Sequence, residues 1–167
     1  ENFVRVARWS AKSRGRVQRH PDYLMVAAQV LIDAGHTVSF VEAAALNMSP
    51  AEAYAAVADH QPHLVVIHAT TPSIYSDIEQ AKAVRDRCGC KIVFVGQHVS
   101  AEPDNTFEIG RDAVDFVAGG EYDYTLRDLA NGVAQSEILG LIWRDGEKIV
   151  HNPPRPCLDV NELPPPA

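Results

Sequence analysis

Two short runs dominated by apolar residues constrain the fold of this 167-residue chain more than any other feature. They are residues 64–69 (LVVIHA) and residues 91–95 (KIVFV). Runs of this length without polar alternation are typical of strands that are buried on both faces of a sheet. Residues 73–87 between them have a helical pattern, and strands joined through a helix form right-handed βαβ crossovers. The chain therefore predicts a parallel sheet covered by helices.

The same alternation of helix and strand extends in both directions from these runs. Ser49 and Pro50, for example, are typical of the cap and first position of a helix. The whole pattern predicts an α/β fold with a flavodoxin-like (Rossmann-like) doubly wound parallel sheet. The further elements expected are a helix over 21–35, a strand over 37–41, a helix over 49–59, a helix over 103–109, a strand over 114–118 and a helix over 122–130.

The first strand of the sheet has two candidate positions. Residues 1–9 supply Phe3, Val4 and Val6, but the strand could also lie upstream, since the chain does not begin with Met. Residues 1–20 also carry six basic groups and one acidic group, although the whole chain has a net charge of −7. This segment is either a solvated basic arm or a loop that meets an anionic ligand.

The character of the sequence changes after Gly132. Residues 138–144 and 148–150 flank Asp145-Gly146, which predicts a small carboxyl-terminal β-hairpin. Six prolines follow in residues 152–167, as in linkers between domains. We therefore expect an α/β domain over 1–134, with 1–20 as basic arm or first strand plus loop, a hairpin extension over 135–151 and a proline-rich linker over 152–167.

Composition excludes several classes of protein. No apolar run approaches the ~20 residues of a membrane span, and the acidic balance disfavours nucleic acid as a partner. The three cysteines do not form a disulfide framework, which favours the cytoplasm, and Cys88-Gly89-Cys90 lacks the spacing of a zinc site. The sequence has neither the glycine patterns of nucleotide-binding loops nor the nucleophile-elbow pattern of serine hydrolases. We expect no catalytic residue and no protein metal ligand in this chain.

Three loops that follow predicted strands are candidates for a binding site. In an open parallel sheet, ligands bind outside the carboxyl ends of the strands. Small and hydroxylated residues there would let a large, flat, amide-rich ligand approach the backbone, with His98 as a contact rather than a base. Each loop alone is also explained by ordinary turn and cap preferences. The candidate residues are Thr70, Thr71, Pro72, Ser73, Gly96, Gln97, His98, Gly119, Gly120 and Glu121.

The order of the motifs around these loops resembles a known family. From about residue 20 to residue 167 the chain is similar to the amino-terminal cobalamin-binding domain of cobalamin-dependent radical S-adenosylmethionine (SAM) enzymes. The matching stretches are 21–24 (PDYL), 34–36 (AGH), 70–73 (TTPS), 95–100 (VGQHVS), 114–121 (VDFVAGGE), 140–142 (GLI) and 161–164 (NELP).

The resemblance implies a corrinoid as ligand. Thr70, Thr71 and Ser73 would then hydrogen-bond the corrin rim or the nucleotide tail, and the glycines 96, 119 and 120 would admit the ring or tail. It also implies a parent enzyme that transfers a methyl group or modifies a lipid or tetrapyrrole. Gln97 departs from the paired glycines frequent in the family. A degenerate domain that binds a substrate or a partner chain is therefore the alternative.

Two family features are missing from the chain. The three-cysteine motif for a 4Fe-4S cluster is absent, so the cluster and SAM are expected in a radical SAM domain beyond Ala167, and this fragment would not be catalytic alone. The Asp-x-His-x-x-Gly motif that supplies a cobalt ligand in many proteins of this fold is also absent. We therefore expect cobalamin bound base-off without a histidine ligand, its lower face covered by the Arg-rich segment or by water. Arg14, Arg16 or Arg19 would pair with the phosphate of the tail.

Overall fold

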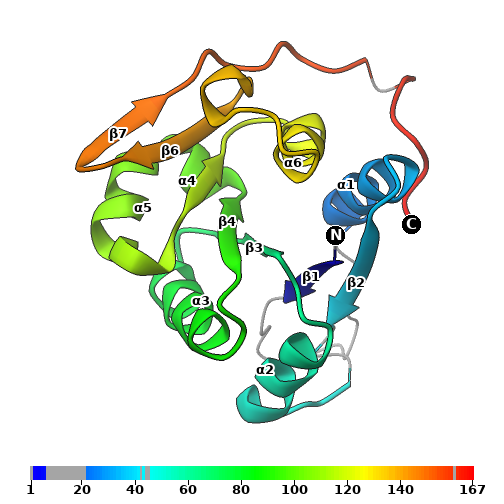
Figure 1. Ribbon diagram of the computed structural model, residues 1–167, viewed down its shortest axis with the longest axis vertical. Helices are drawn as coiled ribbons and strands as arrows, with labels where there is room; N and C mark the ends of the chain where they lie inside the picture. The colour runs from blue at the N-terminus through cyan, green and yellow to red at the C-terminus, as the bar shows by residue number, and fades with distance from the viewer. Residues whose placement is uncertain (1, 7–21, 42, 44–45, 160) are drawn as a thin grey trace.

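A seven-stranded sheet forms the centre of the described part of the chain (Figure 1). The computed structural model describes residues 2–6, 22–41, 43, 46–159 and 161–167. Its strands run in the order β2-β1-β3-β4-β5-β6-β7; the first five in this order are parallel and the last two antiparallel. The strands are β1 (Asn2–Val6), β2 (Thr37–Val41), β3 (Leu64–His68), β4 (Lys91–Val95), β5 (Phe116–Ala118), β6 (Leu141–Asp145) and β7 (Lys148–His151).

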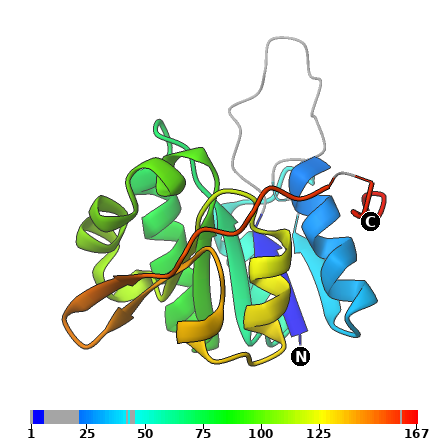
Figure 2. The same cartoon turned by 90° about the horizontal axis from the view of Figure 1, so that it is seen from above.

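Helices cover both faces of this sheet (Figures 1 and 2). One face is covered by α1 and α6, and the other by α2, α3 and α5. The strand order 2-1-3-4-5 with helices on both faces is the flavodoxin-like doubly wound arrangement, so the predicted fold is confirmed. The helices are α1 (Asp22–Asp33), α2 (Pro50–Asp59), α3 (Ile74–Cys88), α4 (Gln97–Ala101), α5 (Pro103–Gly110) and α6 (Asp123–Ala130).

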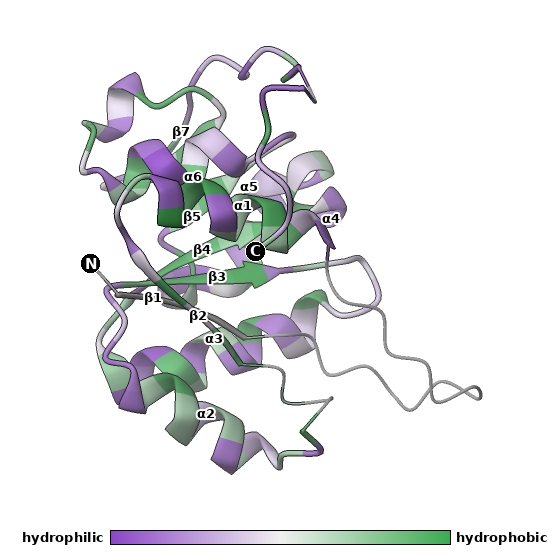
Figure 3. Ribbon diagram, turned by 90° about the vertical axis from the view of Figure 1, so that its right-hand side faces the viewer, coloured by the Kyte–Doolittle hydropathy of each residue, from purple (hydrophilic) through white to green (hydrophobic). Residues whose placement is uncertain are grey.

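The central strands β3 and β4 are apolar except for His68 and Lys91 at their ends, because both of their faces are buried (Figure 3). Successive residues Val65 and Val66 of β3 belong to different core clusters, one on each side of the sheet. Phe94 and Val93 of β4 do the same, and both side chains are fully buried. Since neighbouring side chains of a strand point to opposite faces, a doubly covered strand needs an apolar residue at every position.

The helix that precedes β3 begins where the sequence predicted. Ser49 caps α2 in a reciprocal box: the Glu52 amide donates to the Ser49 hydroxyl at 3.3 Å, and the Ser49 amide donates to the Glu52 carboxylate at 2.7 Å. Both contacts satisfy amides that the first turn of a helix leaves without partners.

Four expectations about the elements need correction or completion. The first strand lies inside the chain, at Asn2–Val6, whereas residues 7–21 are outside the described residues. Residues 97–101, expected as a loop, form the short helix α4. The strand expected from 114 starts at Phe116. At Asp115 the side-chain carboxylate, rather than a backbone carbonyl, accepts the hydrogen bond of the Ile92 amide, and it also accepts one from Lys91. The hairpin starts at Leu141 rather than 138 and joins the main sheet through β5.

Residues 152–167, called the strap below, pass along α6 and end beside α1 (Figure 1). The described strap residues contain no helix or strand, as expected from their prolines. They are nevertheless docked at both ends: the Gly140 amide donates to the Pro153 carbonyl at 2.8 Å, and the Ala167 amide donates to the Met25 carbonyl of α1 at 3.2 Å.

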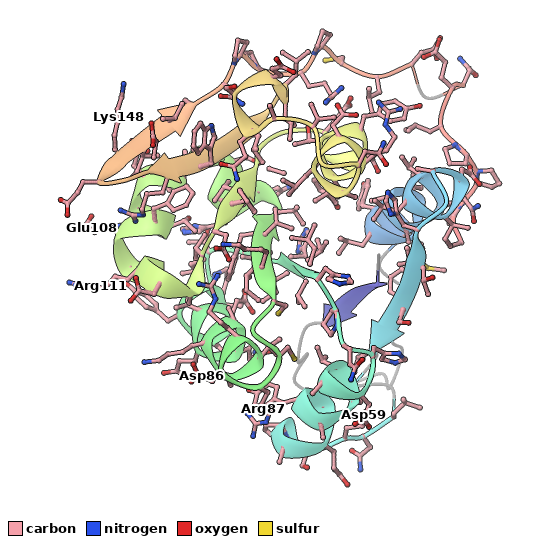
Figure 4. All side chains as sticks on the ribbon, viewed as in Figure 1. Asp59, Asp86, Arg87, Glu108, Arg111 and Lys148 are labelled. Carbon is pink, nitrogen blue, oxygen red and sulfur yellow. The ribbon has the colours of Figure 1, made fainter. Side chains whose placement is uncertain are left out.

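Charged side chains lie around the periphery of the fold. Figure 4 labels Asp86 and Arg87 at the end of α3 and Glu108 on α5, all of which project outward. In the described part of the chain, no helix is both long enough and apolar enough to cross a membrane.

Candidate functional site

The register of the sheet brings the three candidate loops to one edge. His68 is paired with Val95, and Val95 with Ala118, so β3, β4 and β5 end at the same level. The Ala69 amide extends the ladder by donating to the Val95 carbonyl at 2.9 Å. We call residues 69–73, 96–100 and 119–121 the carboxyl edge. This edge is where open α/β sheets bind their ligands.

Thr71 and His98 connect the first two loops of the carboxyl edge. The Thr71 hydroxyl lies 3.2 Å from Nδ1 of His98, which is on α4. Nε2 of the same ring is buried and has no hydrogen-bond partner among the described residues. When the Thr71 hydroxyl donates to Nδ1, the proton of the neutral ring lies on Nε2. The edge therefore presents one buried ring nitrogen, a donor in this tautomer, that has no partner among the described residues.

Ser100 connects the second and third loops. Its hydroxyl donates to the Gly96 carbonyl at 2.9 Å and accepts a hydrogen bond from the Gly120 amide at 3.0 Å. Sequence reasoning placed Ser100 in a candidate loop but did not count it among the site residues. Its contact with Gly96 depends on the short helix α4, which places a serine four residues later one turn away from the Gly96 carbonyl. Because these residues were expected as a loop, the sequence carries no signal for this role.

The loop after β3 is held by its own hydroxyl groups. Oγ of Ser73 lies 3.0 Å from the Thr70 hydroxyl and 2.6 Å from the carboxylate of Asp77, to which it donates. Asp77 lies in the first turn of α3 and is only 3% exposed. A hydroxyl has a single proton, so Ser73 can offer a ligand an acceptor but not a donor while this contact lasts. The loop is thus fixed in shape before any ligand arrives.

The three glycines of the edge have different physical roles. Gly96 adopts φ 112° and ψ 178°, and a Cβ there would lie 2.6 Å from the Ala69 carbonyl oxygen. The space that a side chain on Gly96 would need is therefore occupied by the backbone of the loop after β3. Among the described residues, no atom lies within 4 Å of a Cβ position on Gly120, whose φ is 65°, and the nearest to one on Gly119 is the Gly140 carbonyl oxygen at 3.9 Å. The backbone around Gly120 thus faces open space.

The remaining predicted residues are exposed. Pro72 and Gln97 lie at the surface of the first and second loops. Glu121 is also exposed, and its carboxylate accepts a hydrogen bond of 2.6 Å from the Leu158 amide of the strap. The structure therefore gives Glu121 a partner within the chain, which sequence reasoning did not find because the two residues are 37 positions apart.

Burial shifts the pKa values of two ionisable groups, one near the carboxyl edge and one away from it. Burial raises the pKa of Asp123, at the start of α6, and the nearby Glu121 carboxylate adds to this effect. Burial also raises the pKa of Cys90 to about 11, at the opposite end of β4. Across the described residues, no three His, Cys, Asp or Glu side chains are grouped so that they could hold a metal ion.

These features define a doubly wound α/β domain with a candidate binding site at its carboxyl edge, and comparison with known proteins identifies its family. A profile of the B12 binding domain matches residues 17–130, more than half of the chain. The chain therefore belongs to the B12 binding domain family.

The individual relatives of this chain are longer proteins, and the similarity covers only part of each. The chain is 27% identical over 138 residues to an uncharacterized methyltransferase, PH0819, of Pyrococcus horikoshii, with 79% of this chain and 30% of the relative covered. Among solved structures, it superposes on the cobalamin-bound radical SAM methyltransferase TsrM of Kitasatospora setae with a TM-score of 0.76 and 18% identity, over 98% of this chain and 30% of that one.

A second solved structure is at least as similar in fold. The cobalamin-dependent radical SAM enzyme OxsB with aqua-cobalamin bound gives a TM-score of 0.83 at 16% identity, over 99% of this chain and 24% of OxsB. The chain thus spans less than a third of the length of each of these relatives.

Proposed function

We propose that the carboxyl edge binds cobalamin. The observation that carries this proposal is the buried Nε2 of His98, a ring nitrogen with no described partner, in loops that the register of β3, β4 and β5 brings together. It is a donor when the Thr71 hydroxyl donates to Nδ1. A corrinoid has a rim of amide side chains, whose carbonyl groups are the acceptors that such a donor requires. The residues present therefore fit the group.

Each loop has its own part in this proposal. Thr71 orients the His98 ring, and His98 donates to an amide of the corrin rim or tail. Thr70 and Ser73 offer hydroxyl oxygens, and the backbone around Gly119 and Gly120 accepts the ring or tail at close range. Glu121 is a contact of the strap. The bound corrinoid supplies the cobalt chemistry of methyl transfer, and the chain holds and orients it.

The proposal includes a base-off cofactor without a histidine ligand to cobalt. It is supported by the sequence, which has no Asp-x-His-x-x-Gly motif, whereas the Arg-rich segment is outside the described residues. Electron paramagnetic resonance of the Co(II) form tests it. We expect no nitrogen superhyperfine splitting from the protein; a splitting that His20→Ala or His98→Ala removes would show that histidine is the axial ligand.

We further propose that the chain is the cobalamin-binding part of a cytoplasmic radical SAM enzyme that acts in methyl transfer or in lipid or tetrapyrrole modification. The support is the description of one relative as a methyltransferase and of two structural neighbours as cobalamin-dependent radical SAM proteins. In this proposal, residues 1–134 form the binding domain, 135–151 its hairpin extension and 152–167 the connection to a domain that holds the 4Fe-4S cluster and SAM. Iron and sulfide analysis of the full-length protein tests it.

Titration with hydroxocobalamin tests binding directly. The 167-residue chain should retain the visible bands of the corrin after gel filtration at micromolar ligand. Gly120→Val should weaken binding at least tenfold, about 1.4 kcal/mol, because the larger side chain occupies the open space of the edge. Gly132→Val is the matched control, since Gly132 has a similar φ of 75° and open surroundings at the end of α6.

One result would contradict the cobalamin proposal, and another would contradict the role it gives to Gly120. Loss of the corrin chromophore during gel filtration would favour the alternative, a degenerate domain that binds a substrate or a partner chain instead. Equal losses of binding in the Gly120→Val and Gly132→Val variants would show that the glycines serve only turn geometry.

A further inference from the structure

The strap contacts the carboxyl edge at a single hydrogen bond between described residues. Leu158 donates its amide proton to the Glu121 carboxylate at 2.6 Å, the short distance typical of a charged acceptor. Glu121 follows Gly120 directly, so this contact acts on the backbone of the loop after β5. The hydrogen bond from Leu158 therefore restrains the Gly120–Glu121 backbone, which faces the open space at the carboxyl edge.

The constraint continues from Gly120 into the other loops. The Gly120 amide donates to Ser100, and the Ser100 hydroxyl donates to the Gly96 carbonyl, at the start of α4. On the same short helix, His98 contacts Thr71 of the loop after β3. The strap and all three loops are therefore joined by one series of hydrogen bonds.

A second anchor holds the strap close to this contact in sequence. Arg155 forms an ion pair of 2.5 Å with Asp128 of α6, and its Nε donates to the Thr125 hydroxyl at 3.1 Å. The side chain of Arg155 is only 13% exposed, so this pair is shielded from solvent. The anchor fixes the strap on α6 three residues before Leu158 and keeps the Leu158 amide within reach of Glu121.

We propose that Glu121 is a positioning residue that couples the docked strap to the carboxyl edge. The strap, held by Arg155, restrains Glu121; Glu121 in turn restrains the Gly120 peptide and its hydrogen bond to Ser100. Its effect on cobalamin rests on the proposed function, but the coupling itself is a property of the free chain. Release of the strap loosens the edge, and a ligand bound at the edge tightens the strap.

Amide hydrogen exchange of the ligand-free chain tests the coupling, measured by NMR at Leu158 and Gly120. Glu121→Ala should accelerate exchange at both amides, by about fivefold for the loss of one hydrogen bond. Glu121→Gln keeps a carbonyl acceptor and should stay close to the wild type. Glu108→Ala is the matched control, because Glu108 is an exposed glutamate on the outer side of α5 (Figure 4).

A second substitution removes the other half of the same contact. Leu158→Pro deletes the amide proton and leaves Glu121 in place. If the two residues act through one hydrogen bond, the double variant should accelerate exchange at Gly120 no more than either single variant does. Unchanged exchange at Gly120 in both single variants, or fully additive effects in the double variant, would overturn the proposal.

Binding adds a readout that depends on the proposed function. In Glu121→Ala, the affinity for hydroxocobalamin should fall by about threefold to fivefold, as expected for a site that must be ordered before it binds, and Glu121→Gln should restore it. Wild-type affinity in Glu121→Ala would overturn the effect on binding. Failure of the wild-type chain itself to bind hydroxocobalamin would contradict the proposed function, while the exchange rates of the free chain would still decide the coupling.

Discussion

Replacement of Gly96 by alanine tests whether this glycine serves the packing of the fold. Its backbone, at φ 112° and ψ 178°, lies in a region that only glycine occupies readily. The added Cβ would lie 2.6 Å from the carbonyl oxygen of Ala69 and 3.0 Å from Nε2 of His68. The nearer of these atoms belongs to the backbone of β3's loop and cannot move aside without distorting the ladder.

The expected cost follows from these two effects. A side chain in this backbone region costs about 1–3 kcal/mol, and overpacking of a buried site costs about 1–3 kcal/mol more. Gly96→Ala should therefore lower the free energy of unfolding by about 4 kcal/mol, a large part of the stability of a typical domain. Gly120→Ala should cost only about 1 kcal/mol, because its φ is also positive but no atom lies within 4 Å of the new Cβ.

Urea unfolding followed by circular dichroism measures both variants. With a slope of about 2 kcal/mol per molar urea, Gly96→Ala should lower the midpoint by about 2 M. Comparable midpoints for Gly96→Ala and Gly120→Ala would refute the packing argument. They would show that the loops relax around the added methyl group, and that packing against Ala69 does not require a glycine at position 96.

Three further predictions concern other parts of the fold. Asp115→Ala should cost about 2–3 kcal/mol in urea unfolding, because it removes the acceptor of the Ile92 amide and the carboxylate paired with the partly buried Arg85; a loss within error of zero would mean that water replaces the carboxylate. The Ser49 contacts hold the pKa of Glu52 below its usual value, so the stability that Glu52 adds is present above the unfolded pKa and lost as pH falls through the folded one. Glu52→Gln should thus be less stable than the wild type near neutral pH and equal to it in strong acid; a gap that persists in acid would contradict this. A thiol reagent at neutral pH should modify the exposed Cys157 well before the buried Cys90, whose pKa is about 11, and peptide mass spectrometry that finds equal rates would show that β4 opens readily.

The sequence predicted those elements whose burial leaves a local pattern. The strands at 37–41 and 91–95 were predicted with their observed bounds. β4 pairs on both sides and is covered on both faces, which requires an apolar run, whereas β2 pairs only with β1 at the edge of the sheet, and its signal was its β-branched and aromatic residues. The capped helix at Ser49 was predicted for a similar reason, since its signal lies within four residues.

Elements that depend on distant contacts were missed. Helix α4 is too short to show helical periodicity, and its start depends on the unusual backbone of Gly96. The prolines of the strap predict an extended chain, but its docking depends on Arg155 and Asp128, 27 residues apart. In the candidate site, strand order predicted which loops meet, whereas the roles of Ser100 and Glu121 required the coordinates.

The docked strap also bears on the order in which this chain folds. Its last contact joins Ala167 to Met25, whereas each βαβ unit and the β6–β7 hairpin close over much shorter loops. Because closing a longer loop costs more entropy, we expect the contact of Ala167 to form after the sheet, on the native side of the folding barrier. This contact should then slow unfolding and leave the rate of folding nearly unchanged, so that the end of the strap lengthens the kinetic lifetime of the folded domain.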